Sequence, residues 1–271
     1  MFKERTRLVL SLLCLLFLAD HVSAVEYRTL NFLVDAPSVE VGRQIGAAAE
    51  RYRKELAEKW LGKEMPTWDE PCPLRVTVTG TGSGGATSFA FDNGEILSQR
   101  MHIQGTLDRL LVSVLPHEVT HTILAHHFRS PVPRWADEGG AVLCEDKLER
   151  RRHDQLIRRI VKDGRMIPLS RLFALRDYPT DVMVLYCEGY SVTHFLVEKR
   201  NRKTFLAFVK QGTEDDWDRA LKDHYGYKKV EDLEKEWLAH LRRTAPEKSE
   251  TRTSLSSRPA RPVLCALRER P

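Results

Sequence analysis

The sequence predicts an α+β protein, in which a small mixed sheet comes first and a mainly helical half follows. Three observations predict this class. Short runs rich in β-branched and aromatic residues precede Leu107, and apolar residues recur at helical spacing after it. The chain has 271 residues, 42% of them hydrophobic and 30% charged, which is the balance of a globular protein able to bury a core.

Four segments are predicted to form strands. Residues 29–36 are an apolar run, and residues 74–78 alternate between apolar and polar side chains, as in a half-buried strand. Residues 87–91 and 96–103 are two further strands, joined through the Asp-Asn-Gly sequence at 92–94. An Asn-Gly pair between two such runs predicts a tight hairpin, because both residues accept a positive φ.

A helix is predicted between the first two strands, because apolar residues recur there with helical spacing until Gly62. These residues are Val41, Ile45, Ala48, Tyr52, Leu56 and Trp60. Residues 79–85, TGTGSGG, are expected to form a flexible connection, since the Gly-Lys-Ser/Thr of a phosphate loop is absent. In the helical half, chain breaks are predicted near Pro131, Pro133, Gly164, Pro168 and Pro179.

The first 24 residues have the pattern of a secretory signal peptide. A basic head is followed by an apolar run at 8–19 and by the small residues Ser23 and Ala24. The run is too short to span a bilayer comfortably, and no later segment is apolar for long enough to do so. We therefore expect signal cleavage and an extracytoplasmic location, periplasmic or secreted. An uncleaved membrane anchor is the alternative.

The predicted organisation is one domain between the signal and a C-terminal tail. Residues 25–104 are its sheet-containing part and residues 105–244 its helical part. Residues 245–271 are polar, basic and proline-containing, without the apolar periodicity that would offset the entropy of ordering, so we expect a disordered tail.

Cysteine count and charge narrow the function classes. Cys72, Cys144, Cys187 and Cys265 follow the predicted signal; their even number is compatible with two disulfides, and the pairing stays open. None lies in a C-x-x-C pair, which disfavours a cysteine-based metal site. The net charge of +5 is modest, and the arginine runs lack interleaved aromatic residues, so nucleic-acid binding is not indicated.

The segment LPHEVTHTILAHHF, residues 115–128, contains the pattern H-E-x-x-H. Residues four apart lie on the same face of a helix, so His117 and His121 can bind one metal ion. Glu118, one step round the helix, can reach a water on that ion and act as a general base. The apolar residues on both sides of the pattern predict the buried helix that this arrangement needs.

A catalytic zinc site needs a third protein ligand. The candidate is Glu138 in RWADEGGAV, on a second predicted helix, after the loop that carries Pro131 and Pro133. That loop would turn the chain, so that the second helix packs antiparallel to the first.

With these residues the sequence resembles the gluzincin metallopeptidases, whose signature is H-E-x-x-H followed by a glutamate ligand on the next helix. Residues 133–139 look like the Pro-x-Trp-x-x-Glu-Gly form of the peptidase MA-like group. The resemblance implies a zincin-like (thermolysin-like) fold and one Zn²⁺ per chain, held by His117, His121 and Glu138. His126 and His127 fall off the ligand face and are interpreted as surface or packing residues.

The same resemblance implies a transition-state stabiliser. Gluzincins of the M1 type carry Tyr-x-x-Gly downstream of the glutamate ligand, and the tyrosine hydroxyl steadies the oxyanion. Tyr186 matches that position, and Tyr190 is the second candidate. Alternatively, these tyrosines only fill the core. The Gly-x-Met-Glu-Asn segment of M1 aminopeptidases is absent, so aminopeptidase activity is not implied.

The function expected from the sequence is an exported zinc metallopeptidase that acts on a peptide or protein substrate. Glu118 would be the base, Tyr186 the oxyanion stabiliser, and the hairpin ending at Ile103 would offer an edge strand for extended peptide. A zinc hydrolase acting on another amide, or a non-catalytic binding module with the same fold, are the alternatives. The sequence indicates neither the cleavage preference nor the oligomeric state.

Overall fold

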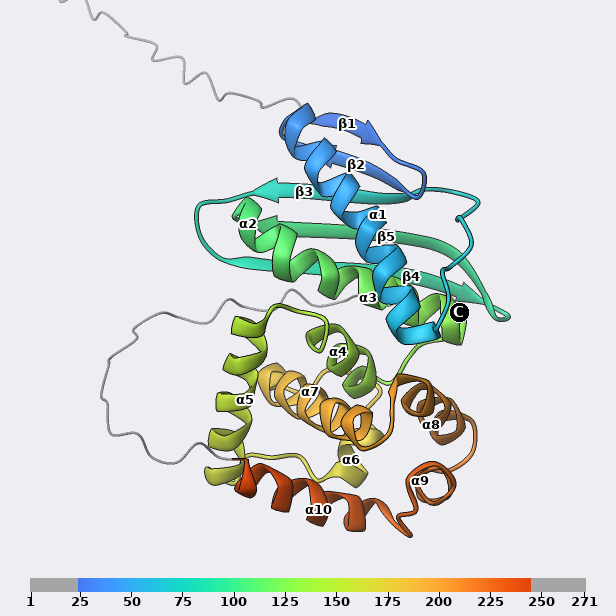
Figure 1. Cartoon of the computed structure of the whole chain (residues 1–271), viewed down its shortest axis with the longest axis vertical. Coiled ribbons are helices and arrows are strands. Elements are labelled where there is room, and N and C mark those ends of the chain that lie inside the picture. The colour runs from blue at the N-terminus through green and yellow to red at the C-terminus, as the bar shows by residue number, and fades with distance from the viewer. Residues whose placement is uncertain (1–23, 245–271) are drawn as a thin grey trace, which may run out of the picture.

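The computed structural model describes residues 24–244. The predicted signal peptide, apart from Ala24, and the predicted tail lie outside the described residues. The fold confirms the α+β class, with a small mixed sheet followed by a mostly helical remainder. In Figure 1 the sheet crosses the upper part of the molecule, and helices α4 to α10 lie below it.

The sheet has the strand order β1-β2-β3-β5-β4. β1 pairs antiparallel with β2, β2 parallel with β3, β3 parallel with β5, and β4 antiparallel with β5. β4 is therefore an edge strand, whereas β5 lies inside the sheet. The strands are β1 (Val25–Arg28), β2 (Phe32–Ala36), β3 (Cys72–Val78), β4 (Ser83–Asp92) and β5 (Glu95–Gly105).

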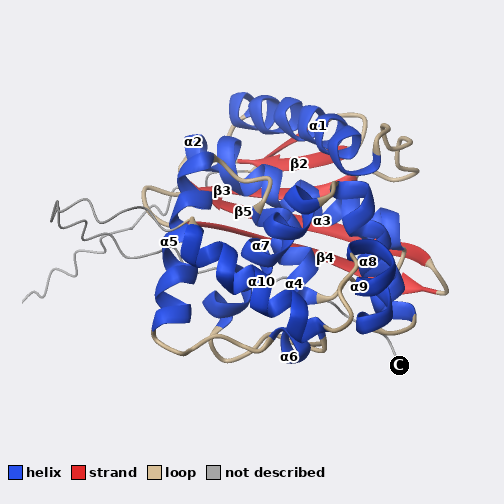
Figure 2. Cartoon of the chain, turned by 60° about the horizontal axis from the view of Figure 1, so that its bottom comes forward, coloured by secondary structure: helices blue, strands red, loops and turns tan. Residues whose placement is uncertain are grey.

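One face of the sheet is covered by helices α1 and α3, which also contact each other. Side chains of β2 and β3 alternate accordingly: Val34 and Leu74 are fully buried, whereas Pro73, Arg75 and Thr77 are exposed on the other face. Figure 2 shows the helical half in front of the sheet. None of the described helices is long and apolar enough to cross a membrane.

The helices account for most of the chain after the sheet. Several begin at a residue whose side chain caps the first backbone N–H groups, as at Ser38, Asp146 and Asn201. The helices are α1 (Val39–Leu61), α2 (Leu107–Arg109), the π-helical turn η1 (Leu110–Val114), α3 (Leu115–Phe128), α4 (Arg134–Val142), α5 (Lys147–Lys162), α6 (Leu169–Phe173), α7 (Val182–Lys199), α8 (Arg202–Glu214), α9 (Trp217–Tyr225) and α10 (Val230–Arg243).

Two predictions about the sheet were wrong in detail. Residues 29–31 form a turn between β1 and β2, because Glu50 of α1 accepts hydrogen bonds from the Thr29 hydroxyl and from the backbone and side chain of Asn31. Part of the glycine-rich segment is not a flexible connection: Ser83 and the two glycines after it pair with β5 as the first residues of β4. The predicted hairpin turn is present, with positive φ at Asn93 and Gly94.

The helix that carries the H-E-x-x-H pattern is preceded by a π-helical turn. The N–H of Leu115 donates to the carbonyl of Leu110, five residues back, rather than four. The next residue, Pro116, has no N–H and cannot continue a regular helical ladder. The wider π-helical turn just before this proline therefore lets the helix run without a break from α2 to α3.

No disulfide joins the cysteines in the described part of the chain. Cys72, Cys144 and Cys187 are free thiols. Burial raises the pKa of the Cys72 and Cys187 thiols to about 12, so neither is a reactive thiolate at neutral pH. Cys265 lies outside the described residues.

Candidate metal centre

Two imidazoles of α3 and one carboxylate of α4 meet in the interior. His117 and His121, one helical turn apart, direct their Nε2 atoms to the same carboxylate oxygen. Oε2 of Glu138 lies 3.4 Å from Nε2 of His117 and 3.7 Å from Nε2 of His121. Glu138 is fully buried and His121 is 2% exposed. The structure thus brings together the three residues that the sequence predicted as ligands.

These residues could hold a metal ion. One ligand atom from each lies within 4.8 Å of the other two. Ligands about 2.0–2.1 Å from a tetrahedral ion stand roughly 3.3 Å apart, close to the observed nitrogen–oxygen separations. Oε2 of Glu138 is buried and accepts no hydrogen bond, a costly arrangement for a carboxylate unless a cation binds there.

Each histidine has a carboxylate at its other ring nitrogen. Oε1 of Glu145 lies 2.7 Å from Nδ1 of His117, and Oδ1 of Asp137 lies 2.8 Å from Nδ1 of His121. Such carboxylates fix the tautomer and the ring orientation of metal-binding histidines. Neither carboxylate was predicted from the sequence as part of the site. Asp137 directly precedes the predicted ligand Glu138, so its position in the sequence could have suggested a role in the site. Glu145 lies outside any sequence motif.

Charge keeps the ligand carboxylate ionised despite its burial. Desolvation alone would raise the pKa of Glu138, but the neighbouring His117 and His121, together with the Tyr178 hydroxyl, lower it to about 2. An anionic Glu138 next to two imidazoles is a donor set for a divalent cation.

Glu118 follows the first histidine, and its carboxylate bonds to the edge strand rather than to the three candidate ligands. It is 3% exposed, and its Oε2 accepts a hydrogen bond of 2.6 Å from the hydroxyl of Thr87 on β4. Burial raises the pKa of this carboxyl above its usual range, while the nearby His117 and His121 oppose the shift. Its Oε1 lies against Gly85, where an added Cβ would be only 2.4 Å away.

The predicted tyrosine lies beside the metal centre. The Tyr186 ring is stacked on His117, with centroids 6.3 Å apart and planes at 9°. The second candidate, Tyr190, stacks on His194 and also contacts His153, one turn further along α7. A third tyrosine, Tyr178, was not predicted from the sequence; its hydroxyl donates to Oε1 of Glu138 over 2.5 Å. It lies in the connection between α6 and α7, where no motif marks it.

Helices α4 and α7 cross at two glycines, and this crossing brings Glu138 toward Tyr186. A Cβ on Gly139 would lie 2.3 Å from the carbonyl oxygen of Gly189, and a Cβ on Gly189 would lie 2.5 Å from the carbonyl oxygen of Trp135. The fully buried Trp135 stacks on Phe173 with centroids 4.3 Å apart. The glycines that follow Glu138 and Glu188 are therefore required by close helix packing.

The two other histidines of α3 lie away from this cluster. His126 stacks on Trp68, with centroids 5.2 Å apart, and its Nε2 lies 3.1 Å from the side-chain oxygen of Gln99. His127 is exposed and contacts Phe128. They occupy a packing and a surface position, respectively.

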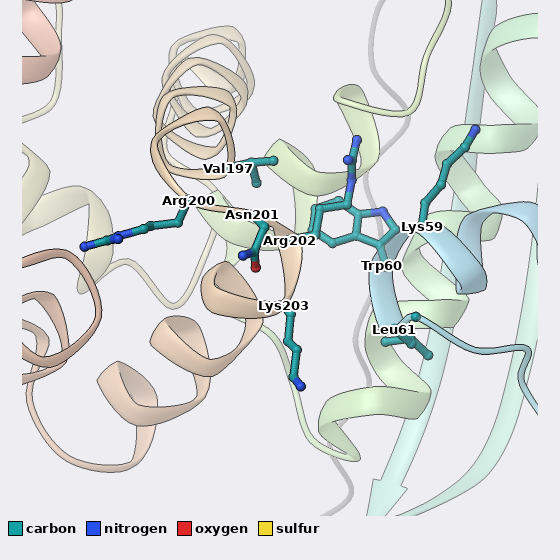
Figure 3. A pocket seen from close by; sticks show the side chains of 9 residues that line it. Lys59, Trp60, Leu61, Val197, Arg200, Asn201, Arg202 and Lys203 are labelled. Atoms are coloured by element: carbon teal, nitrogen blue, oxygen red, sulfur yellow. The ribbon is translucent and has the colours of Figure 1, made fainter.

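A hollow of about 420 Å³ lies outside this cluster, between the end of α1 and the start of α8 (Figure 3). It is lined by Trp60 and by basic side chains, but none of the predicted site residues reaches it. Lys59, Arg200 and Lys203 extend in different directions there, so they do not converge on one point (Figure 3). The groups suited to chemistry are thus at the buried His-His-Glu cluster.

Comparisons of the chain with family models, with curated proteins and with solved structures each gave no match.

Proposed function

We propose that the protein is a zinc-dependent metallopeptidase. The observation that carries the proposal is the buried carboxylate oxygen of Glu138, which accepts no hydrogen bond and faces the Nε2 atoms of His117 and His121. A purely structural role for three buried polar residues would pair that oxygen with a donor.

Zinc is the metal that this donor set favours. Two imidazole nitrogens and one carboxylate oxygen form a ligand set of catalytic zinc sites, which keep a further position for water or substrate. Magnesium and calcium prefer all-oxygen sites. Two histidines and one carboxylate also hold Fe(II) in non-haem oxygenases, and zinc is favoured here because the two histidines lie in an H-E-x-x-H helix with Glu118 beside them. The carboxylate of Glu145 supports this choice, because its hydrogen bond to Nδ1 of His117 leaves Nε2 of that histidine available as a ligand. Asp137 lies in the corresponding place, 2.8 Å from Nδ1 of His121.

The reaction follows from the residues that are not ligands. Bound Zn²⁺ would polarise the scissile carbonyl and lower the pKa of a coordinated water to about 7. Glu118, on the same helix as both histidine ligands, would take a proton from the attacking water and deliver it to the leaving amine. The Tyr186 hydroxyl would donate to the oxyanion as negative charge develops.

The edge strand β4 supports peptide as the substrate. An extended peptide can add to an exposed sheet edge by main-chain hydrogen bonds. β4 is such an edge, and its inner face touches the metal helix through Thr87 and Glu118.

Export is part of the proposal, on the basis of residues 1–24. N-terminal sequencing of protein recovered outside the cytoplasm should begin at Val25. An intact N-terminus on protein held in the membrane would instead indicate an uncleaved anchor.

The decisive experiment combines metal analysis with hydrolysis of a peptide library. Wild-type protein should contain one zinc per chain and cleave peptides. Glu118→Gln should keep the zinc and lose cleavage, because the change removes the base without touching a ligand. His121→Ala should lose both.

Other results would separate the alternatives. Full zinc content without cleavage of any peptide by the wild type would favour a binding module or another amide hydrolase. Wild-type protein without zinc, or undiminished zinc in His121→Ala, would overturn the metal assignment.

A further inference from the structure

Two residues of the edge strand enclose the carboxylate of Glu118. The Thr87 hydroxyl donates to Oε2 over 2.6 Å. Gly85, two residues earlier on the same buried face of β4, leaves the space that Oε1 occupies, because a Cβ there would lie 2.4 Å from that oxygen. Both oxygens of the Glu118 carboxylate thus contact the same strand, β4.

The helix alone does not fix this carboxylate. A glutamate side chain has three rotatable bonds, and a general base must stand within about 0.5 Å of its productive position. The two histidines on the same helix do not supply that restraint, because their ring nitrogens are engaged with Glu138, Glu145 and Asp137. The restraint comes from β4.

The hydrogen bond has the length expected of a strong one. Hydroxyl groups that donate to an ionised carboxylate do so over about 2.5–2.7 Å. The same hydroxyl lies 3.4 Å from the main-chain carbonyl of Glu118, so the carboxylate is the closer acceptor. Thr87 is fully buried, which shields this bond from competing water.

We propose that Thr87 is a positioning residue for Glu118, and that Gly85 is required to keep room for the same carboxylate. This inference rests on the proposed function, in which Glu118 is the base. One strand then has two roles: its edge receives the extended peptide, and its inner face sets the group that transfers the proton.

Kinetics of Thr87 variants test the positioning role. Thr87→Val keeps the shape and removes the hydroxyl. It should lower kcat by about ten- to hundredfold, part of the 10²–10⁴ that a positioned base contributes, with KM nearly unchanged. Thr87→Ser, which restores the donor, should recover most of the lost rate. Thr77→Val is the matched control, because Thr77 is exposed on β3 and bonds to His102.

Gly85→Ala tests the space requirement. The added methyl group must displace the Glu118 carboxylate, so kcat should fall at least as far as in Thr87→Val. Gly80→Ala is the control for the same substitution, since a Cβ there meets nothing within 4 Å. Zinc content, and the visible spectrum of Co²⁺-substituted protein, should match the wild type in all of these variants, because no ligand is touched.

A double mutant links the effect to the base. If Thr87 acts through Glu118, then Thr87→Val should cause no further loss when it is added to Glu118→Gln. A further loss, an unchanged kcat in Thr87→Val, or a failure of Thr87→Ser to recover the rate would each overturn the positioning role.

Crystal structures of the zinc-loaded variants give a readout that does not require activity. In Thr87→Val the Glu118 carboxylate should leave the position it holds in the wild type, and in Thr87→Ser it should return. If the wild type cleaves no peptide while Glu118 still moves in this way, the proposed function fails and the positioning contact stands. If the wild type is active and Glu118 stays in place in Thr87→Val, the positioning role fails alone.

Discussion

The carbonyl oxygen of Gly189 lies 2.3 Å from the point that a Cβ on Gly139 would occupy. At this crossing the backbones of α4 and α7 are in contact, and the Thr193 hydroxyl of α7 lies 2.4 Å from the same point. Gly139 directly follows the candidate ligand Glu138, and Gly189 lies three residues after Tyr186. The distance between the two helices therefore also sets the distance between a metal ligand and the predicted oxyanion donor.

Replacing Gly139 by alanine should force these helices apart. We expect Gly139→Ala to lower the free energy of unfolding by about 2–4 kcal/mol, since backbone cannot yield as a side chain can. Metal affinity should fall with it, because Glu138 moves with α4. Gly140→Ala is the control: its Cβ would first meet the end of the Leu124 side chain, at 3.1 Å. Equal urea midpoints for the two variants would contradict this account of the crossing.

The carboxylates behind the histidines should govern metal affinity. Glu145→Gln and Asp137→Asn keep the shape of each side chain but weaken its hold on Nδ1 of the neighbouring histidine. Each should weaken zinc binding by about 10–100-fold, measured by competition with a chelator. Glu149→Gln is the control, because Glu149 bonds to Arg109 and not to a histidine. If the control weakened zinc binding as much, general loss of stability rather than ligand orientation would be the cause.

A buried carboxyl on α7 should make stability depend on pH. Glu188 is fully buried, and burial raises its pKa from 4.5 to about 8, with a smaller contribution from Glu234 of α10. Between these two values the folded state holds a proton that the unfolded state has released. The free energy of unfolding should therefore fall as the pH rises from about 4.5 to 8, by an amount on the order of 4 kcal/mol.

Glu188→Gln removes this titration and keeps the side-chain oxygen that accepts from the N–H of Ile167. Urea unfolding across this pH range should show the variant to be more stable than the wild type at pH 8, with the difference vanishing near pH 4.5. Glu234→Gln should leave most of the pH dependence, since burial is its main cause. A wild-type stability that does not decrease over this interval would refute the assignment.

The sequence predicted the parts of the site that depend on local geometry. Helical spacing alone places His117 and His121 on one face, and the predicted turn after α3 brings Glu138 within reach. Contacts between distant segments could not be read in the same way. Thr87 is 31 residues from Glu118, and Tyr178 is 40 residues from Glu138. These pairs exist because the sheet edge packs against α3 and the α6–α7 connection packs against α4.

The errors in the sheet have the same origin. Residues 29–31 have strand-like composition, but Glu50 on α1 satisfies their polar groups in a turn. The glycines at 84 and 85 look like a flexible loop, yet they extend β4, where the absence of a side chain at Gly85 leaves room for Glu118. In both cases a partner far along the sequence overrides the local preference.

Tyrosine variants distinguish an active peptidase from a site that only binds metal. Tyr186→Phe should lower kcat by about 10²–10³ with little change in KM, the scale of one lost oxyanion donor, because the hydroxyl matters most as charge develops. Zinc content should not change, since the ring that stacks on His117 remains. Tyr190→Phe is the control and should be silent, because Tyr190 packs against His153 and His194.

Tyr178→Phe should behave differently from both. Its hydroxyl donates to Oε1 of the ligand Glu138, so its loss should weaken zinc binding more than it lowers kcat at saturating zinc. Measuring kcat across a zinc titration for the three variants distinguishes these roles. If Tyr178→Phe lowers kcat at saturating zinc and Tyr186→Phe does not, the oxyanion donor is Tyr178, and the role that the resemblance implies for Tyr186 is wrong. If Tyr190→Phe is the damaging change, the Tyr-x-x-Gly alignment is misplaced by one helical turn.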